Sequence, residues 1–153
     1  MRAKKAIISL LLGISILSLP GQAAAQSWYD ANWGYRQKIA ISFEITTADL
    51  TNFPLLIKIT DPTHPLFGVA QGDGDDILFT SSDGTTKLDH EIETYSASGD
   101  TLLAWVRVPL LSSTVDTEIF LYYGHGTAPN QQNPTGVWDS DFVMVQHLDE
   151  TSG

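Results

Sequence analysis

Apolar and polar residues alternate along several short stretches between Tyr35 and Tyr123, and turn residues separate these stretches. Side chains on one face of a strand recur with a period of two, so this alternation predicts β-strands. The expected strands cover residues 35–43, 53–59, 76–80, 88–95, 101–108 and 117–123. No stretch repeats its apolar residues with the period of an α-helix. The pattern therefore predicts an all-β fold, an antiparallel β-sandwich that is jelly-roll-like in form.

The same alternation predicts which side chains fill the core. In the stretch 101–108 the small apolar residues share one face, and Trp105 lies on the other. Tyr122 and Tyr123 are adjacent, so one of them must point away from the core. The residues that we expect to be mostly buried are Ile39, Ile41, Leu56, Ile77, Phe79, Ile92, Val106, Ile119 and Leu121.

A polar stretch, 127–136, interrupts the pattern and predicts a loop or a linker. An apolar pattern resumes at Val137 and Trp138 and continues through residues 142–148, just before the chain stops. We therefore expect residues 27–126 to form the sandwich domain. Residues 137–153 would begin a second β-domain of a longer, multidomain protein, truncated here.

The N-terminus has the features of a leader for export. Arg2, Lys4 and Lys5 precede an apolar run that is too short to span a bilayer, and small residues follow at 23–25. A signal peptide over residues 1–25, cleaved after Ala25, is the prediction. It places the protein in the periplasm or on the cell surface.

Charge and cysteine content narrow the possible partners. Residues 1–25 hold three of the eight Lys and Arg and none of the 18 Asp and Glu, so the rest carries a net charge of −13. Nucleic acids and anionic membrane surfaces attract basic patches, so neither is an expected partner, and the mature part should not insert into a membrane. The chain has no Cys, which excludes disulfides and thiolate metal sites.

Seven motifs in a fixed order carry a family resemblance. They are Trp33-x-Tyr35-Arg36, Asn52-Phe53-Pro54, Gly74-x-Asp76-Ile77-x-Phe79-Thr80, Asp83-Gly84, Leu88-x-His90-Glu91-Ile92-Glu93, Ala104-Trp105-Val106-x-Val108-Pro109 and Leu121-Tyr122-Tyr123-Gly124. As a set they resemble the bacterial and archaeal family called domain of unknown function 2341, over roughly residues 27–126. His90 stands where that family often has an aromatic residue.

The resemblance implies an envelope or cell-surface protein. The family has no assigned activity, so no catalytic residue carries over. Some relatives place such domains on the periplasmic side of a biopolymer-transport proton channel, and others carry adhesion-type repeats. The tail from Trp138 onward resembles the opening strand of a laminin-G or concanavalin-A-like lectin domain, which commonly follows in the family.

Four acidic residues are the densest candidates for a metal site: Asp73, Asp75, Asp76 and Asp83. Ca²⁺ takes six to eight oxygens from flexible loops, and the neighbouring glycines would permit the bends. The spacing does not match an EF-hand loop, however. The alternative is a solvated turn in which Asp76 caps backbone N–H groups. We expect no metal and no cofactor.

Two further groups of residues are weak catalytic or metal-binding candidates. Glu91 and Glu93 would share a face of a strand at a separation seen in glycosidase pairs, but two Glu on a polar face are ordinary. The four histidines, His64, His90, His125 and His147, are scattered and form no metalloprotease motif. The sequence therefore predicts no catalytic residues and no enzyme.

The aromatic residues Trp28, Tyr29 and Trp33 are the best binding candidates, because they precede the first strand. They either form an exposed platform on which a sugar ring stacks, or fold back to cover an open end of the sandwich. We expect a non-catalytic binding or adhesion module of an envelope protein, with a polysaccharide or another envelope protein as partner. The alternative is a structural or assembly module on the proton-channel subunit.

Overall fold

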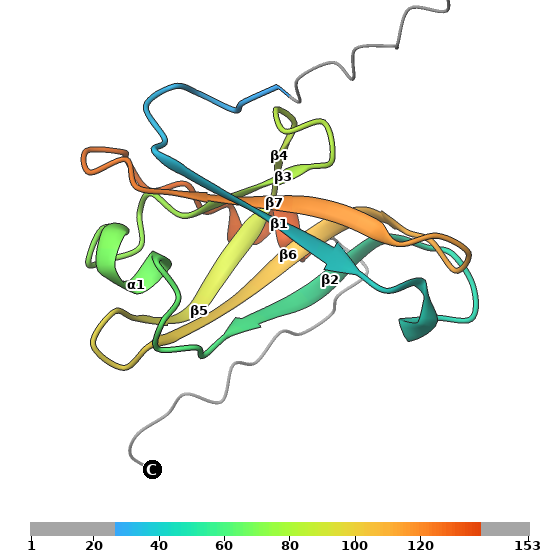
Figure 1. Cartoon of the computed structure of the whole chain (residues 1–153). Helices are drawn as coiled ribbons and strands as arrows, with labels where there is room; N and C mark the ends of the chain where they lie inside the picture. The colour runs from blue at the N-terminus through green and yellow to red at the C-terminus, as the bar shows by residue number, and fades with distance from the viewer. Residues whose placement is uncertain (1–26, 139–153) are drawn as a thin grey trace, which may run out of the picture.

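The computed structural model describes residues 27–138 and places their strands in two antiparallel sheets (Figure 1). The predicted antiparallel sandwich is confirmed. The predicted leader, 1–25, and the apolar stretch 142–148 lie outside the described residues. In chain order the elements are β1 (Tyr35–Ile41), η1 (Phe43–Ile45), β2 (Leu50–Ile59), α1 (Leu66–Val69), β3 (Leu78–Ser81), β4 (Lys87–Leu88), β5 (His90–Ser96), β6 (Thr101–Leu111), β7 (Thr117–Tyr123) and α2 (Pro134–Val137).

The two sheets have the strand orders β1-β7-β3-β4 and β2-β6-β5. All pairings are antiparallel, and most join strands that are distant in the sequence: β1 pairs with β7, and β2 with β6. The longest strand, β6, lies at the centre of the three-stranded sheet. Because β7 lies between β1 and β3, it is the central strand on which the four-stranded sheet depends.

The main core fills the space between the sheets. Ala104, Val106 and Val108 of β6 all point into it, as their alternation predicts. Most of the residues expected to be buried are buried: Ile41, Ile77, Phe79, Val106, Ile119 and Leu121. Ile39 and Ile92 pack against the same core and are partly buried.

Leu56 is the exception, and its predicted burial is wrong. Its side chain is 41% exposed, and its neighbour Ile57 is buried instead. Leu56 pairs with Trp105, which faces outward from β6, whereas Ile57 pairs with the inward-facing Ala104. The run Leu55-Leu56-Ile57 is apolar throughout, so its alternation could not fix which face is buried.

The single strand expected over residues 88–95 is two strands in different sheets. β4 pairs with β3, whereas β5 pairs with β6, so the chain crosses from one sheet to the other at Asp89. Within β5 the register shifts between Ile92 and Thr94, which leaves Glu93 as the extra residue of a bulge. The bulge puts Tyr95, and not Thr94, against the core.

The polar stretch 127–136 is packed on the sandwich. Asn133 donates its backbone N–H to the carbonyl of His90 at 2.9 Å, and the side chain of Gln132 accepts the N–H of Ile92 at 2.7 Å. Val137 of α2 is buried. The stretch therefore extends the edge of the three-stranded sheet at β5.

The four-stranded sheet also buries its outer face. Leu78, Phe120 and Tyr122 point away from the main core, and residues 27–33 and Ala128 cover them. We call this group, Tyr29, Trp33, Leu78, Phe120, Tyr122 and Ala128, the outer cluster. Figure 1 shows the blue N-terminal segment lying over that side of the molecule. β7 is consequently buried on both faces.

Candidate functional site

The N-terminal aromatic residues differ in their exposure. Trp33 is only 6% exposed, and its indole Nε1–H donates to the backbone carbonyl of Asp76 at 2.7 Å. Its ring lies 4.6 Å from that of His125 and 5.3 Å, edge to face, from that of Tyr29. Trp33 is therefore packed on the outer face of the four-stranded sheet, and not over an open end of the sandwich.

Trp28 keeps more of its surface, at 41% exposed. The guanidinium of Arg36 lies 4.7 Å from the centre of its ring and equally far from that of Phe120. The Trp28 indole donates to the carbonyl of Trp33 at 3.0 Å. Cation–π contact and this hydrogen bond hold Trp28 in place, and they leave less of the ring free to stack on a sugar.

Tyr122 is the hydrogen-bonding centre of this region. Its hydroxyl donates to the carbonyl of Gly84 at 2.8 Å and accepts from the backbone N–H of Tyr29 and from Arg36. Gly84 has φ +77°, and a Cβ there would lie 2.2 Å from the carbonyl oxygen of Ser27. The turn between β3 and β4 thus fits closely against the first described residue.

The acidic candidates do not assemble into one site. Asp76 is fully buried, and its carboxylate accepts the backbone N–H groups of Gln71, Gly124 and His125 at 2.7–2.9 Å. Asp73 accepts the N–H of Asp75 at 3.1 Å. Within residues 27–138 the structure gathers no group of three His, Cys, Asp or Glu side chains able to hold a metal ion.

Asp83 organises a turn. It accepts the N–H groups of Thr85 and Thr86 and the hydroxyls of Ser81 and Thr86. These bonds, led by the side chain and the backbone of Thr86, hold the pKa of Asp83 well below its usual range. The carboxylate is therefore an acceptor in the β3–β4 turn.

Glu91 and Glu93 each bind a tryptophan. Glu93 accepts the indole N–H of Trp105 at 2.7 Å, and Glu91 that of Trp138 at 2.5 Å. The two indole rings meet edge to face at 5.3 Å. This group lies on the outer face of the three-stranded sheet, where both carboxylates have partners that hold them in place.

The described histidines lie apart. His64 contacts Gln37 and accepts the N–H of Leu66, and desolvation lowers its pKa. His90 is fully buried against Phe79, and the same cause lowers its pKa to about 4. The Nε2 atom of His90 has no hydrogen-bond partner among the described residues. The fourth, His147, lies outside them.

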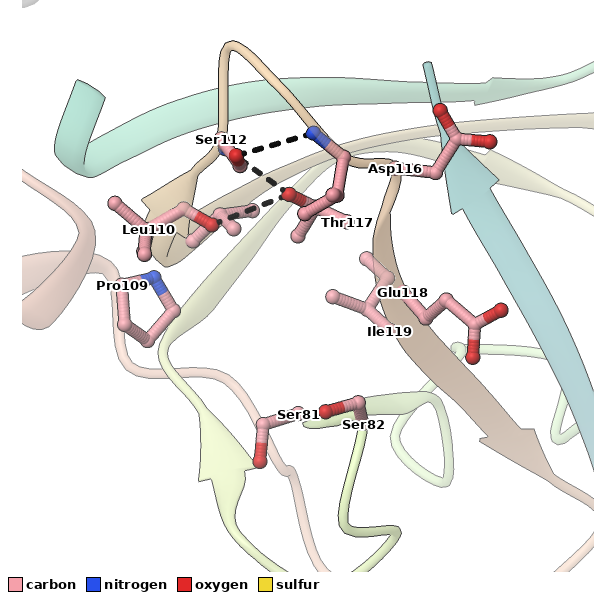
Figure 2. Close-up of a pocket in the computed structure, with 11 residues that line it drawn as sticks. Ser81, Ser82, Pro109, Leu110, Ser112, Asp116, Thr117, Glu118 and Ile119 are labelled. Carbon is pink, nitrogen blue, oxygen red and sulfur yellow. Dashed lines mark hydrogen bonds between the residues drawn. The ribbon is translucent and has the colours of Figure 1, made fainter. Parts of the chain in front are cut away.

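The sequence did not reveal a cleft between the two sheets at the end where β6 leads into β7 (Figure 2). The cleft has a volume of about 480 Å³. Figure 2 shows Pro109 and Leu110 on one side, Glu118 and Ile119 on the other, and Ser81 and Ser82 at the far end. The Thr117 hydroxyl accepts the N–H of Ser112 at 3.2 Å and donates to the carbonyl of Leu110 at 3.4 Å, which closes the loop above the cleft.

Exposed apolar side chains concentrate around this cleft. Residues 27–138 expose eight large hydrophobic side chains, and five belong to η1, the start of β2, the end of β6 and the β6–β7 loop: Phe43, Ile45, Phe53, Leu110 and Val115. Hydrogen bonds join these segments, because Asp116 accepts the N–H of Phe43 and Asp49 accepts that of Ser113. We call this part of the sandwich the apolar end; in Figure 1 it lies at the right.

The family model described as "Domain of unknown function (DUF2341)" matches residues 73–153, more than half of the chain. The chain belongs to the DUF2341 family. The match supports the resemblance predicted for residues 27–126 over residues 73–126, and it continues to the last residue. The lectin-like domain expected from residue 137 onward has no support from it. No curated protein matches the chain, and no solved structure does.

In this DUF2341 domain the match includes every residue that lines the cleft, from Ser81 to Ile119. The aromatic residues Trp28, Tyr29 and Trp33, and η1, precede the matched range. None of the helices between residues 27 and 138 has the length and apolar content of a membrane span.

Carboxylates surround the apolar end of the DUF2341 domain. Glu44, Asp49 and Asp116 are exposed, and Glu118 forms a 2.7 Å ion pair with Lys38. The backbone N–H of Ser113, and next its hydroxyl, lower the pKa of Asp49, so this residue stays charged in mildly acidic solution. The end therefore combines exposed hydrophobic side chains with a negative rim.

Proposed function

We propose that this DUF2341 domain is a non-catalytic binding module of a larger exported protein, and that it binds an envelope protein through the apolar end. One observation carries the proposal: five of the eight exposed large hydrophobic side chains in residues 27–138 belong to segments that meet at this end. Concentrated exposed apolar surface is a common mark of a protein-binding site.

A protein partner fits this surface better than a polysaccharide does. Sugar rings stack on open aromatic faces, whereas the most exposed side chains of this end, Ile45, Leu110 and Val115, are aliphatic, and its two aromatic residues, Phe43 and Phe53, are each only 39% exposed. Trp33 is inside the outer cluster, and Arg36 lies against the ring of Trp28. Both features weigh against the N-terminal platform and favour the apolar end as the binding surface.

The arrangement of reactive side chains supports a non-catalytic role. Each carboxylate of the pair Glu91 and Glu93 accepts an indole N–H, which orients it toward a tryptophan. The leader-like residues 1–25 support export. An assembly role on the periplasmic side of a proton-channel subunit would use the same end, with the channel assembly as the partner.

Site-specific photo-crosslinking in cells that export the chain tests the proposal. A crosslinker at Val115 should give a protease-sensitive adduct, and one at Ser98, in the turn between β5 and β6, should not. Leu110→Ser should remove the adduct. Equal adducts from both positions, no adduct from Val115, or polysaccharide retention that depends on Trp28 would each contradict the proposal.

A further inference from the structure

The apolar end has a charge pattern that restricts its partner. The segments that form this end, residues 42–53 and 109–118, contain no Lys or Arg. The basic residues on the adjoining strands are Lys38, which is paired with Glu118, and Arg107, which lies opposite Pro54 and donates to the carbonyl of Gly136. Glu44, Asp49 and Asp116 lie in the same segments as the exposed hydrophobic side chains. The field at the apolar end is therefore negative.

From this pattern we infer that the partner presents a segment that is both apolar and basic. Its Lys or Arg side chains would meet the negative rim, and its aliphatic side chains would cover Leu110 and Val115. This inference rests on the proposed function. Complementary charges select the partner and its orientation, and burial of apolar surface supplies most of the affinity.

Two of the rim carboxylates, those of Asp49 and Asp116, are held in defined positions. Oδ1 of Asp49 accepts the N–H and the hydroxyl of Ser113 at 2.8 and 2.9 Å, and Oδ1 of Asp116 accepts the N–H of Phe43 at 3.1 Å. Within residues 27–138 no hydrogen bond is seen to the second oxygen of either residue, so that oxygen can meet a partner's cation. Fixed carboxylates lose less side-chain entropy on binding than mobile ones do.

A second copy of this chain fits the apolar end poorly. In a two-fold interface the same patch meets itself, so the rims of two copies would bring Glu44, Asp49 and Asp116 close to their equivalents. Like charges at close range repel, and this cost grows as water is excluded from the interface. A different chain of opposite charge avoids that cost.

Three labelled ten-residue peptides test the inference against the full chain: alternating Leu and Lys, alternating Leu and Glu, and alternating Ser and Lys. Fluorescence anisotropy measures binding. We expect the Leu–Lys peptide to bind most tightly and its affinity to fall several-fold between about 50 and 500 mM salt, because screening shortens the reach of the rim charges.

Matched variants locate the binding. Leu110→Ser with Val115→Ser should weaken the Leu–Lys peptide by about tenfold or more, because it removes the apolar contact. Glu44→Gln with Asp116→Asn should weaken it about fivefold, and the new amide oxygen at 116 can still accept the Phe43 N–H. The control, Asp75→Asn with Asp100→Asn, removes two charges at the opposite end and should change affinity by less than about twofold.

The remaining outcomes overturn the inference in distinguishable ways. An equal effect of the control variant would mean that peptides respond to net charge alone. Tight binding of the Ser–Lys peptide would mean that the apolar side chains are not used. Equal binding of the Leu–Glu peptide at this end would refute a basic partner and leave the proposed function standing. If no peptide binds, the inference fails, and the crosslinks from Val115 decide the proposed function separately.

Discussion

The outer cluster and the apolar end are both apolar surfaces of one sandwich, and they differ in what covers them. Over the outer cluster, residues 27–33 lay Trp33 and Tyr29 onto Phe120 and Tyr122, and hydrogen bonds fix the cover. At the apolar end Leu110 and Val115 remain 47% and 63% exposed. The chain covers the surface that it needs for stability, and the uncovered one is the better candidate for a partner.

The largest expected effect is at Trp33. Truncation of a buried aromatic side chain removes its transfer free energy and leaves a cavity, so Trp33→Ala should lower the free energy of unfolding by about 3–5 kcal/mol. The matched aromatic truncation at the apolar end, Phe43→Ala, should cost about 1 kcal/mol or less, because Phe43 is 39% exposed. Urea denaturation measures both. Equal losses would erase the distinction between the two regions.

Acid should weaken the domain through its main core, where His90 is buried. The pKa of His90 is about 4 in the folded state and about 6.5 in an unfolded chain, so the unfolded state takes up the proton first as pH falls. Stability is then fully present above pH 6.5 and is lost toward pH 4, by about 2–3 kcal/mol between pH 7 and 4.5. The pKa of His64 is lowered too, so it adds a smaller loss in the same window.

His90→Leu replaces the titrating side chain with one that is uncharged at every pH. It therefore separates the contribution of His90 to the loss of stability in acid from that of His64. It should remove most of the acid dependence in urea titrations at pH 7 and 4.5, and leave the part that is due to His64. An unchanged acid dependence in His90→Leu would refute this account of the core.

A substitution at Gly84 tests how closely the N-terminal segment packs against the β3–β4 turn. Its φ of +77° strains any other residue, and a Cβ would lie 2.2 Å from the carbonyl of Ser27, so Gly84→Ala should cost about 1–3 kcal/mol. Gly126→Ala is the control, since nothing lies within 4 Å of the position of its Cβ. If both substitutions cost the same, the cover over the outer cluster is looser than these contacts indicate.

Strand positions could be predicted well where one face alone is apolar. The alternation of Ala104, Val106 and Val108 with Trp105 fixed the buried face of β6, because a sheet side chain has only two directions to point. The run Leu55-Leu56-Ile57 lacks that alternation, so pairing with β6 decided its register. Likewise Leu88 and His90 fit one strand by pattern, and only the tertiary structure assigns them to different sheets.

The candidate sites were harder to predict for a different reason. Trp28 and Trp33 both lie in an irregular segment with no period, so their sequence could not tell which ring is buried. The apolar end is assembled from segments separated by dozens of residues, and each contributes one or two ordinary hydrophobic residues. No local pattern marks such a surface, although Val115 among Ser, Thr and Asp is the kind of exposed residue that could have drawn attention.

The smallest expected effect is at the apolar end, and the comparison depends on it. Val115 is 63% exposed in a loop held by Ser112, Thr117 and Asp49, and none of those bonds uses its side chain. Val115→Ser should therefore change the free energy of unfolding by less than about 0.5 kcal/mol, as surface substitutions usually do. Ile119→Ser, two strand positions into β7 and buried, is the contrasting variant and should unfold at much lower urea concentration. A large loss in Val115→Ser would show that the apolar end supports the fold itself. Its exposed side chains would then need no partner to explain them.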